Sequence, residues 1–246
     1  MQIAVASNLC CNLPALESLL WKIENLREEG RPVSKIYIIG ILGLLPYARE
    51  IYEILSGLDN VVLVKGKFDK LISRADEKFE EKVPDFIKEP ARWNWKSLGI
   101  EGRLWLKNIR ERVVDEFNGV RYLFTYENPL NPLELVEACR ERAYYEKIHE
   151  KLREYKVLVF AGKDEFYVRT SYGKVISPGS IGVKIRKKAK PSFIVIDTEN
   201  VEVHSFEIDY DESEIKDRLK TVNFPKNIGK TIYKIYETGV ILNLKV

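Results

Sequence analysis

The run IAVASNLCCNLPALESLL at residues 3–20 constrains the fold more than any other part of the chain, because it joins a buried strand, a loop and the start of a helix. Residues 3–6 are apolar and suit a central strand, whereas residues 7–12 are polar and suit a turn. Pro14 fits a first helical turn. Apolar side chains follow it at helical spacing: Leu16, Leu19, Leu20 and Ile23. The sequence therefore predicts a strand, a loop and a helix in succession.

Two further apolar runs, at residues 35–40 and 60–65, predict buried strands, and the first helix is expected to end near Gly30. The amphipathic residues 48–58 lie between these runs and predict a helix. Strands that alternate with helices at this spacing are typical of a largely parallel sheet. Ligand sites of such sheets lie at the carboxyl ends of the strands, so we expect the three loops after these strands to converge at one edge.

Residues 70–108 are charged and carry several tryptophans, and their apolar positions recur at helical spacing, which predicts a helical insertion. Residues 112–126, RVVDEFNGVRYLFTY, then form two alternating runs around Asn118-Gly119, a strong hairpin signal that is expected to begin a second sheet. The remaining elements are expected in this order: a long charged helix in 129–155, a buried strand at 157–161, two short strands in 166–176 that turn at Tyr172-Gly173, a tight loop at 177–182, strands at 192–197 and 201–208, and an acidic helix start with a short tail in 209–246.

Composition narrows the class of protein. Lysine and arginine number 40 against 37 aspartate and glutamate, and the net charge of +3 is too small to indicate nucleic-acid binding by itself. No apolar run approaches the roughly 18 to 20 residues of a membrane-spanning helix, so a soluble protein is expected. Cys10, Cys11 and Cys139 form an odd count without a signal peptide, which favours a reducing cytoplasm over a disulfide framework. A charged fraction of 31% with a single methionine is typical of a hyperthermophile.

The loop after the first strand resembles the opening motif of the calcineurin-like metallophosphoesterases, in their small archaeal and bacterial subfamily, which reads roughly SDIHGNLPALEALL. The matching residues are Ser7, Asn12, Leu13, Pro14, Ala15, Leu16 and Glu17. Residues 90–109 and 205–225 resemble the helical insertion and the usual ending of the same family. The resemblance implies an α/β/β/α sandwich of two mixed sheets flanked by helices. It implies a single domain over residues 1–246, with the insertion at about 70–110 and a C-terminal extension at about 209–246.

The family's phosphodiesterase activity uses two divalent cations, and two dications about 3.5 to 4 Å apart need several carboxylate, imidazole or amide ligands. In the opening motif the family's metal-binding aspartate falls on Asn8, and its first histidine falls on Cys10. The Gly-Asp pair that ends the family's second strand falls on Gly40-Ile41. The aspartate of that pair bridges the metals in the family, whereas isoleucine cannot coordinate a metal.

The later motifs are replaced in the same way. GNHD falls on residues 66–69, VHGSP on 125–129 and GHTH on 162–165, whereas NPGSVG is nearly intact at 177–182. We call the eight positions that correspond to the family's metal-binding and catalytic residues the motif positions, and none carries the family's residue: Asn8, Cys10, Ile41, Lys67, Phe68, Tyr126, Lys163 and Glu165. The resemblance therefore implies a vestigial site with no catalytic residue, no bound metal and no cofactor.

The chain has only two histidines, His149 and His204, and neither lies in a matching motif. We therefore interpret the chain as a pseudoenzyme, a non-hydrolytic binding or regulatory protein that could also be a homo-oligomer. The alternative is a residual metal-dependent phosphodiesterase or phosphatase with a remodelled site. That site would combine a thiol with amide and carboxylate oxygens from Asn8, Cys10, Asp69, Glu127, Asp164 and Glu165.

Lysine at two motif positions suggests a phosphate-bearing ligand instead of a metal. The candidate anion-binding residues are Lys65, Lys67, Lys163 and Ser180. The amides of residues 177–182 and the N-terminus of the first helix are expected to help. Positive charge at these positions disfavours a dication. Internal pairing remains open, in which Lys67 and Lys163 meet Asp69, Asp164 and Glu165.

Three other features have less specific interpretations. The basic run KIRKKAK at residues 184–190 lacks interleaved aromatic residues, so we expect a solvated loop and no nucleic-acid partner. No motif places a histidine near Cys10 and Cys11 to lower a thiol pKa, which favours buried thiols over nucleophiles. The aromatic residues Trp93, Trp95, Trp105, Tyr144 and Tyr145 are expected to pack in the core, and exposure of these side chains would instead indicate a partner surface.

Overall fold

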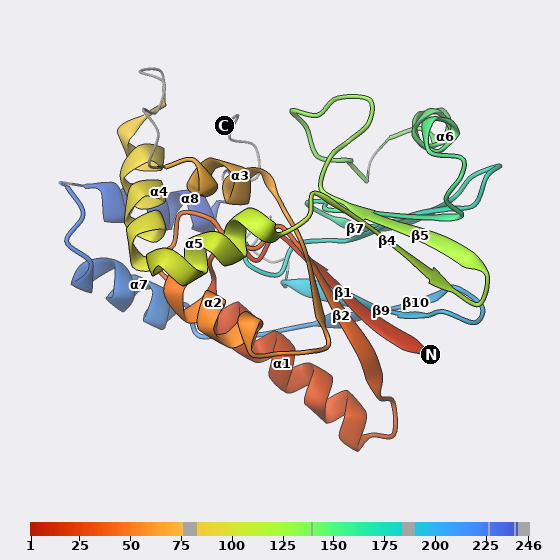
Figure 1. The fold of residues 1–246 in the computed structure, drawn as a ribbon, viewed down its shortest axis with the longest axis horizontal. Coiled ribbons are helices and arrows are strands. Elements are labelled where there is room, and N and C mark those ends of the chain that lie inside the picture. Colours follow the sequence, from red (N-terminus) through yellow and green to blue (C-terminus); the bar gives the residue numbers. More distant parts are fainter. Residues whose placement is uncertain (76–82, 139, 184–189, 226, 239, 241–246) are drawn as a thin grey trace.

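The computed structural model describes residues 1–75, 83–138, 140–183, 190–225, 227–238 and 240 (Figure 1). The first sheet has the order β10-β9-β1-β2-β3 and is formed by β1 (Gln2–Ser7), β2 (Val33–Ile39), β3 (Val61–Val64), β9 (Ser192–Asp197) and β10 (Glu202–Glu207). The second sheet has the order β4-β5-β6-β8-β7 and is formed by β4 (Arg112–Phe117), β5 (Val120–Thr125), β6 (Val157–Phe160), β7 (Glu165–Arg169) and β8 (Lys174–Pro178). Both sheets combine parallel and antiparallel pairs. The prediction of two mixed sheets flanked by helices is confirmed.

The helices of the described residues are α1 (Leu13–Glu28), α2 (Ala48–Ser56), α3 (Lys67–Ser73), α4 (Asp85–Ser97), α5 (Gly99–Asn108), α6 (Arg142–Lys151), α7 (Glu212–Thr221) and α8 (Ile228–Glu237). Figure 1 shows α4, α5, α7 and α8 grouped at one end of the strands, whereas α6 lies apart beside the second sheet. None of the described helices is both long and apolar enough to cross a membrane.

The two sheets share a core of buried aliphatic and aromatic side chains. Tyr37 of β2 and Phe124 of β5 stack across the two sheets, with ring centroids 3.9 Å apart. The apolar runs of β1 and β9 are buried, as expected for strands inside a sheet. A smaller cluster under α6 includes Tyr145 and Phe160. Trp95 and Trp105 pack partly buried against the main core.

The first strand, loop and helix agree with the sequence prediction in detail. Asn12 caps α1, since its side-chain oxygen accepts a hydrogen bond from the Ala15 amide at 3.1 Å, and Pro14 lies in the first turn. The loop between β1 and α1 is unusual because Asn8, Cys10 and Cys11 all have φ between 53° and 60°. Residues other than glycine and asparagine rarely adopt this left-handed backbone region. The contacts of the loop therefore hold a backbone conformation that is unfavourable in free energy.

Two predictions about helices are wrong. The long helix expected in residues 129–155 is confined to α6, because Pro129 and Pro132 break the helical ladder upstream. In addition, the Asn128 side chain accepts a hydrogen bond from the Leu130 amide at 3.0 Å, which favours a turn. The short tail expected after α7 contains a second helix, α8, whose isoleucines are buried. Cys139, residues 184–189 of the basic run and residues 241–246 lie outside the described residues.

Candidate functional site

The loops after β1, β2, β3 and β5 meet around one small cavity of about 10 Å³. Its walls include five of the eight motif positions: Asn8, Cys10, Lys67, Phe68 and Tyr126. The two glycines that end the neighbouring segments, Gly40 and Gly66, lie under the Tyr126 ring, and a Cβ atom on either would come within 2.9 Å of that ring. The fold therefore gathers most of the motif positions, as the parallel strand order predicts, and Tyr126 fills much of the space between them.

The other three motif positions lie elsewhere. The Ile41 side chain is fully buried in the core. Lys163 lines a second cavity of about 170 Å³ together with Ser180, Ser192 and Lys190. Glu165 also borders this second cavity, but it is exposed on β7, and its carboxylate accepts a hydrogen bond from the Ser205 hydroxyl of β10.

The Asn8 side chain is used to join loops. Its amide nitrogen donates to the Gly162 carbonyl at 2.8 Å and to the Ser7 hydroxyl at 3.2 Å, whereas its buried oxygen has no hydrogen-bond partner in the described structure. The Asn8 carbonyl accepts the Gly182 amide at 3.0 Å. A Cβ atom at Gly182 would lie 1.9 Å from the Leu9 carbonyl oxygen, so only glycine permits this approach.

In the nearly intact SPGSIG loop at residues 177–182, the backbone amides form hydrogen bonds within the protein. The Ile181 and Gly182 amides donate to the carbonyls of Ser7 and Asn8, both at 3.0 Å. The Gly179 amide donates to the Ser177 hydroxyl at 3.2 Å. The Ile181 and Gly182 amides therefore hold the β1 loop, the Gly179 amide is bonded within its own loop, and none of the three faces an open anion site.

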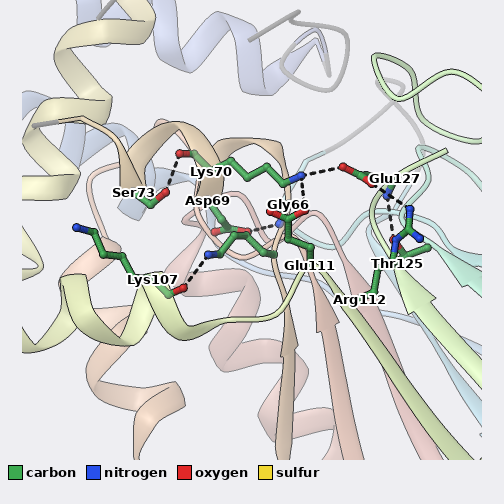
Figure 2. Close-up of polar contacts among 10 residues, drawn as sticks. Gly66, Asp69, Lys70, Ser73, Lys107, Glu111, Arg112, Thr125 and Glu127 are labelled. Atoms are coloured by element: carbon green, nitrogen blue, oxygen red, sulfur yellow. Dashed lines mark hydrogen bonds and ion pairs between the residues drawn. The ribbon is translucent and has the colours of Figure 1, made fainter. Parts of the chain in front are cut away.

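Asp69 of α3 organises the loop after β2, which in the resembled family carries the bridging aspartate. Its fully buried carboxylate accepts three backbone N–H groups, from Ile41 at 3.0 Å, Leu42 at 2.7 Å and Gly66 at 2.6 Å. Figure 2 shows Asp69 beside Gly66. Burial raises the pKa of Asp69 to about 6, against the three amides, which lower it. A protein carboxylate thus joins the loops after β2 and β3.

The hydroxyl of Tyr236, in α8, joins the next part of the same loop. It accepts the Leu44 amide at 3.1 Å and the Leu45 amide at 3.3 Å, and it donates to the Cys10 carbonyl of the β1 loop. A Cβ atom at Gly43 would lie 2.6 Å from this hydroxyl, so Tyr236 and Gly43 fit together closely. Sequence reasoning missed this residue, because nothing local connects a helix near the C-terminus with a loop near the N-terminus.

Asn94 of α4 completes the set of contacts to this loop. Its amide nitrogen donates to the carbonyls of Gly43 at 2.9 Å and Leu45 at 3.0 Å, and the side chain is fully buried. The Gly43 amide in turn donates to the Cys11 sulfur at 3.1 Å. A sequence signal existed for Asn94, since it occupies a position on the buried face of α4 that Ile87 and Ala91 also occupy.

The candidate anion-binding lysines do not form one group. The pKa of Lys67 is lowered to about 8. Burial is the main cause, Cys10 opposes it, and Lys163 adds to it. Lys67 and Lys163 are therefore close enough for their charges to interact. The Lys65 ammonium has a different partner, because it donates to the Lys107 carbonyl at the end of α5 at 3.1 Å. Burial also lowers the pKa of Lys65.

Comparison with protein-family models and with curated proteins gave no match. Among solved structures, the hypothetical protein PH1004 from Pyrococcus horikoshii OT3 superposes with a TM-score of 0.85 and 34% identity, over 94% of this chain and 97% of that protein. A metallophosphoesterase from Sphaerobacter thermophilus superposes with a TM-score of 0.71 and 17% identity, over 93% of this chain and 97% of that chain. This chain belongs to the family of PH1004, and its fold is that of the calcineurin-like metallophosphoesterases. The resemblance noted in the opening motif is thereby confirmed at the level of fold.

The thiols of this metallophosphoesterase-fold protein are buried among the loops. Burial raises the pKa of Cys10 to about 12, although Lys67 lowers it. Burial also raises the pKa of Cys11, whose sulfur accepts the Gly43 amide. A thiol with a raised pKa stays protonated at neutral pH, and the protonated form is a poor nucleophile and a poor metal ligand. This agrees with the interpretation of both cysteines as buried thiols.

The carboxylates of the hypothetical remodelled metal site are dispersed over the metallophosphoesterase fold. Asp69 faces amides, and Glu165 faces Ser205. Glu127 pairs with Lys70 at 2.8 Å and with Arg112 at 3.3 Å, and Lys70 also pairs with Glu111 at 3.0 Å (Figure 2). Lys70 and Arg112 lower the pKa of Glu127. Within the described residues, no group of three His, Cys, Asp or Glu side chains is placed to hold a metal ion.

Proposed function

We propose that the chain is a non-hydrolytic binding protein on the metallophosphoesterase fold, and that its ligand carries a phosphate group. The observation that supports this most is Lys67, the first residue of α3, which is mostly buried and has its pKa lowered to about 8, mainly by burial and also by Lys163. A desolvated ammonium beside a second lysine gains stability when an anion arrives. An anion at this position would be bound by both charges.

The space for such a ligand lies beside Lys163. This lysine, Ser180 and Ser192 line the cavity of about 170 Å³, whose lining also includes Asp164 and Glu165. Two ammonium groups with hydroxyl donors suit phosphate oxygens. The Lys65 ammonium is bonded to the Lys107 carbonyl, so Lys65 has no role in this proposal.

The side chains at the motif positions do not fit a dinuclear metal centre. Ile41 and Phe68 offer no donor atom, and Lys67 and Lys163 carry positive charge. The Cys10 thiol, with its raised pKa, stays protonated at neutral pH. Two dications would face repulsion from the lysines without a bridging carboxylate to neutralise them. We therefore derive no hydrolytic step from this site.

The test uses isothermal titration and thermal melting with inorganic phosphate and with a nucleoside monophosphate. We expect both ligands to raise the Tm, as ligands that bind only the folded state must. Lys67→Met and Lys163→Met are each expected to weaken phosphate binding by about tenfold, since a hydrogen bond to a charged group contributes about 1.5 to 3 kcal/mol. Lys96→Met, at an exposed position of α4, is the matched control and should leave binding unchanged. Flat titrations with both ligands would overturn the proposal.

The alternative function is a residual metal-dependent phosphodiesterase or phosphatase. A manganese-supplemented assay on a generic phosphodiester, together with metal analysis of the purified protein, separates the two. We expect no turnover above the rate of a mock preparation. Reproducible turnover that disappears with chelator, in a protein that carries stoichiometric metal, would establish the alternative.

A further inference from the structure

Among the described residues, strand β7 has an open hydrogen-bonding edge. It pairs there with β8 alone and forms one end of the second sheet. The Thr170 amide donates to the Gly173 carbonyl at 2.9 Å and closes the hairpin, whereas the Lys174 amide points the other way, to the Lys156 carbonyl. Because hydrogen-bonded and non-hydrogen-bonded pairs alternate in an antiparallel ladder, the backbone groups of Glu165, Tyr167 and Arg169 point away from β8. No other described strand pairs with them.

The side chains of the same three residues share one exposed face, since β7 alternates between exposed and half-buried positions. They border a groove of about 480 Å³, whose opposite wall is formed by residues 200–203. Tyr167 is 39% exposed but held in place. The Lys174 ammonium lies 5.4 Å from its ring centre, and the Arg169 guanidinium donates to its hydroxyl at 3.3 Å. An ordered tyrosine at an open edge is a ready contact surface, because little entropy is lost when it is covered.

The order of charges on this face makes it complementary to itself. Glu165 and Arg169 stand two positions before and after Tyr167. If a second copy of β7 lies antiparallel across a two-fold axis at Tyr167, each Glu165 faces Arg169 of the other copy. The same alignment brings the outward backbone groups of all three residues opposite each other. A shift by two residues would place Arg169 against tyrosine and would lose both charge pairs.

We propose that β7 is the surface on which a second copy of this chain docks, so that the second sheets of the two copies form one continuous sheet. The contact is isologous, as expected for a dimer with two-fold symmetry. Its affinity should be modest, because a strand pair of this length covers less than the roughly 1,200 Å² of a standard interface. The proposal is independent of the phosphate ligand.

Charges on a short edge strand can also serve to prevent pairing. That alternative predicts the opposite response to mutation. If the charges on β7 repel a second copy, reversing or removing them would not weaken association. The two explanations are therefore separated by swapping the charges within β7.

The experiment is sedimentation velocity of the full chain over about 5 to 500 μM, a range that covers weak association. We expect the wild-type weight-average mass to rise with concentration. Glu165→Arg and Arg169→Glu should each weaken association by about tenfold, because like charges then lie opposite each other. The double variant Glu165→Arg/Arg169→Glu restores complementarity and should recover most of the affinity, even though it also loses the Ser205 contact. Glu116→Arg on β4, the other edge of this sheet, is the matched control.

A crosslink tests the register directly. In a Cys139→Ala background, Tyr167→Cys should give a covalent dimer on oxidation, since residues at a two-fold hydrogen-bonded pair lie about 5.5 Å apart, within disulfide reach. Val168→Cys, on the opposite face of the strand, should not. Thermal melting of each variant confirms that it folds. A wild-type chain that stays monomeric over the whole range, a double variant as weak as the single ones, or equal crosslinking at both positions would overturn the proposal.

Discussion

Asp69 shows at the scale of one residue how this chain closes its loops. Its carboxylate accepts backbone N–H groups from the ends of two neighbouring strands, where related folds place metal ligands. In the sequence, Asp69 corresponds to the last residue of the family's GNHD motif, but only the structure shows that its carboxylate faces backbone amides. The buried charge is stabilised by these donors, and each amide depends on it in turn.

Asp69→Ala is expected to lower the free energy of unfolding by about 3 to 5 kcal/mol, because three buried amides lose their acceptor at once. Asp69→Asn keeps one acceptor oxygen and should cost less. Urea unfolding monitored by fluorescence measures both. Asp85→Ala, an exposed change in the first turn of α4, should cost no more than about 0.5 kcal/mol. A loss below about 1 kcal/mol for Asp69→Ala would show that the amides find water instead.

Lys67 gives the proposed anion site a pH dependence. The free protein holds this lysine with a pKa of about 8, so the ammonium form is lost as pH rises through that value. Anions bind the ammonium form, and affinity for sulfate, which does not titrate in this range, should fall by about tenfold between pH 7.5 and 9.5. Lys67→Arg stays charged and should remove most of this dependence. Titrations that weaken equally in the wild type and the arginine variant would assign the effect to another group.

At the scale of elements, periodicity predicted the strands and helices of the N-terminal half well. The failures have local causes. No helix forms in the residues just before α6, because Pro129 and Pro132 interrupt the helical hydrogen bonds. A prediction from the pattern of charged and apolar residues alone does not include this effect of proline. Helix α8 carries Ile228, Ile232 and Ile235 at helical spacing. This spacing predicts a helix, so the expectation of a short tail overlooked a pattern that the sequence contains.

His149 connects α6 to the turn between β7 and β8, and this element should be sensitive to acid. Its Nε2 donates to the Tyr155 carbonyl at 2.8 Å, so in the neutral ring Nδ1 accepts a hydrogen bond from the Thr170 hydroxyl at 2.6 Å. Burial lowers the pKa of His149. The unfolded chain therefore takes up a proton first as pH falls, and stability is lost below the ordinary histidine pKa of about 6.5.

We expect this histidine to contribute a loss of about 1 kcal/mol between pH 7.5 and 5.5, measured by urea unfolding. Asp69 acts in the opposite direction, because its pKa is raised in the folded state, so the wild type must be compared with His149→Gln, in which the contribution of Asp69 is unchanged. His204→Gln, at a partly exposed site, is the control. Equal pH slopes for the wild type and His149→Gln would contradict the assignment.

For the whole molecule, the sequence predicted that the loops meet at one edge, because parallel strand order alone decides this. It could not predict which side chains face the cavity. Glu165 points to Ser205 instead, and Lys65 reaches the end of α5. Tyr236 and Asn94 come from a C-terminal helix and a helical insertion, and only tertiary packing brings them to the loop after β2.

A molecule whose loops are joined by its own side chains should not need metal for stability. We expect the Tm to change by less than about 1 °C when chelator or manganese is added, since a ligand that does not bind the folded state cannot stabilise it. Differential scanning calorimetry at constant ionic strength measures this. A Tm that rises with manganese concentration and falls with chelator would show that a metal binds the folded chain.

The contact between Cys10 and Tyr236 spans 226 positions of the chain. During translation the strands of the first half can form before the last helix leaves the ribosome, but the β1 and β2 loops cannot reach their final arrangement until Tyr236 emerges. The β1 loop is therefore synthesised early but is among the last parts of the structure to become ordered.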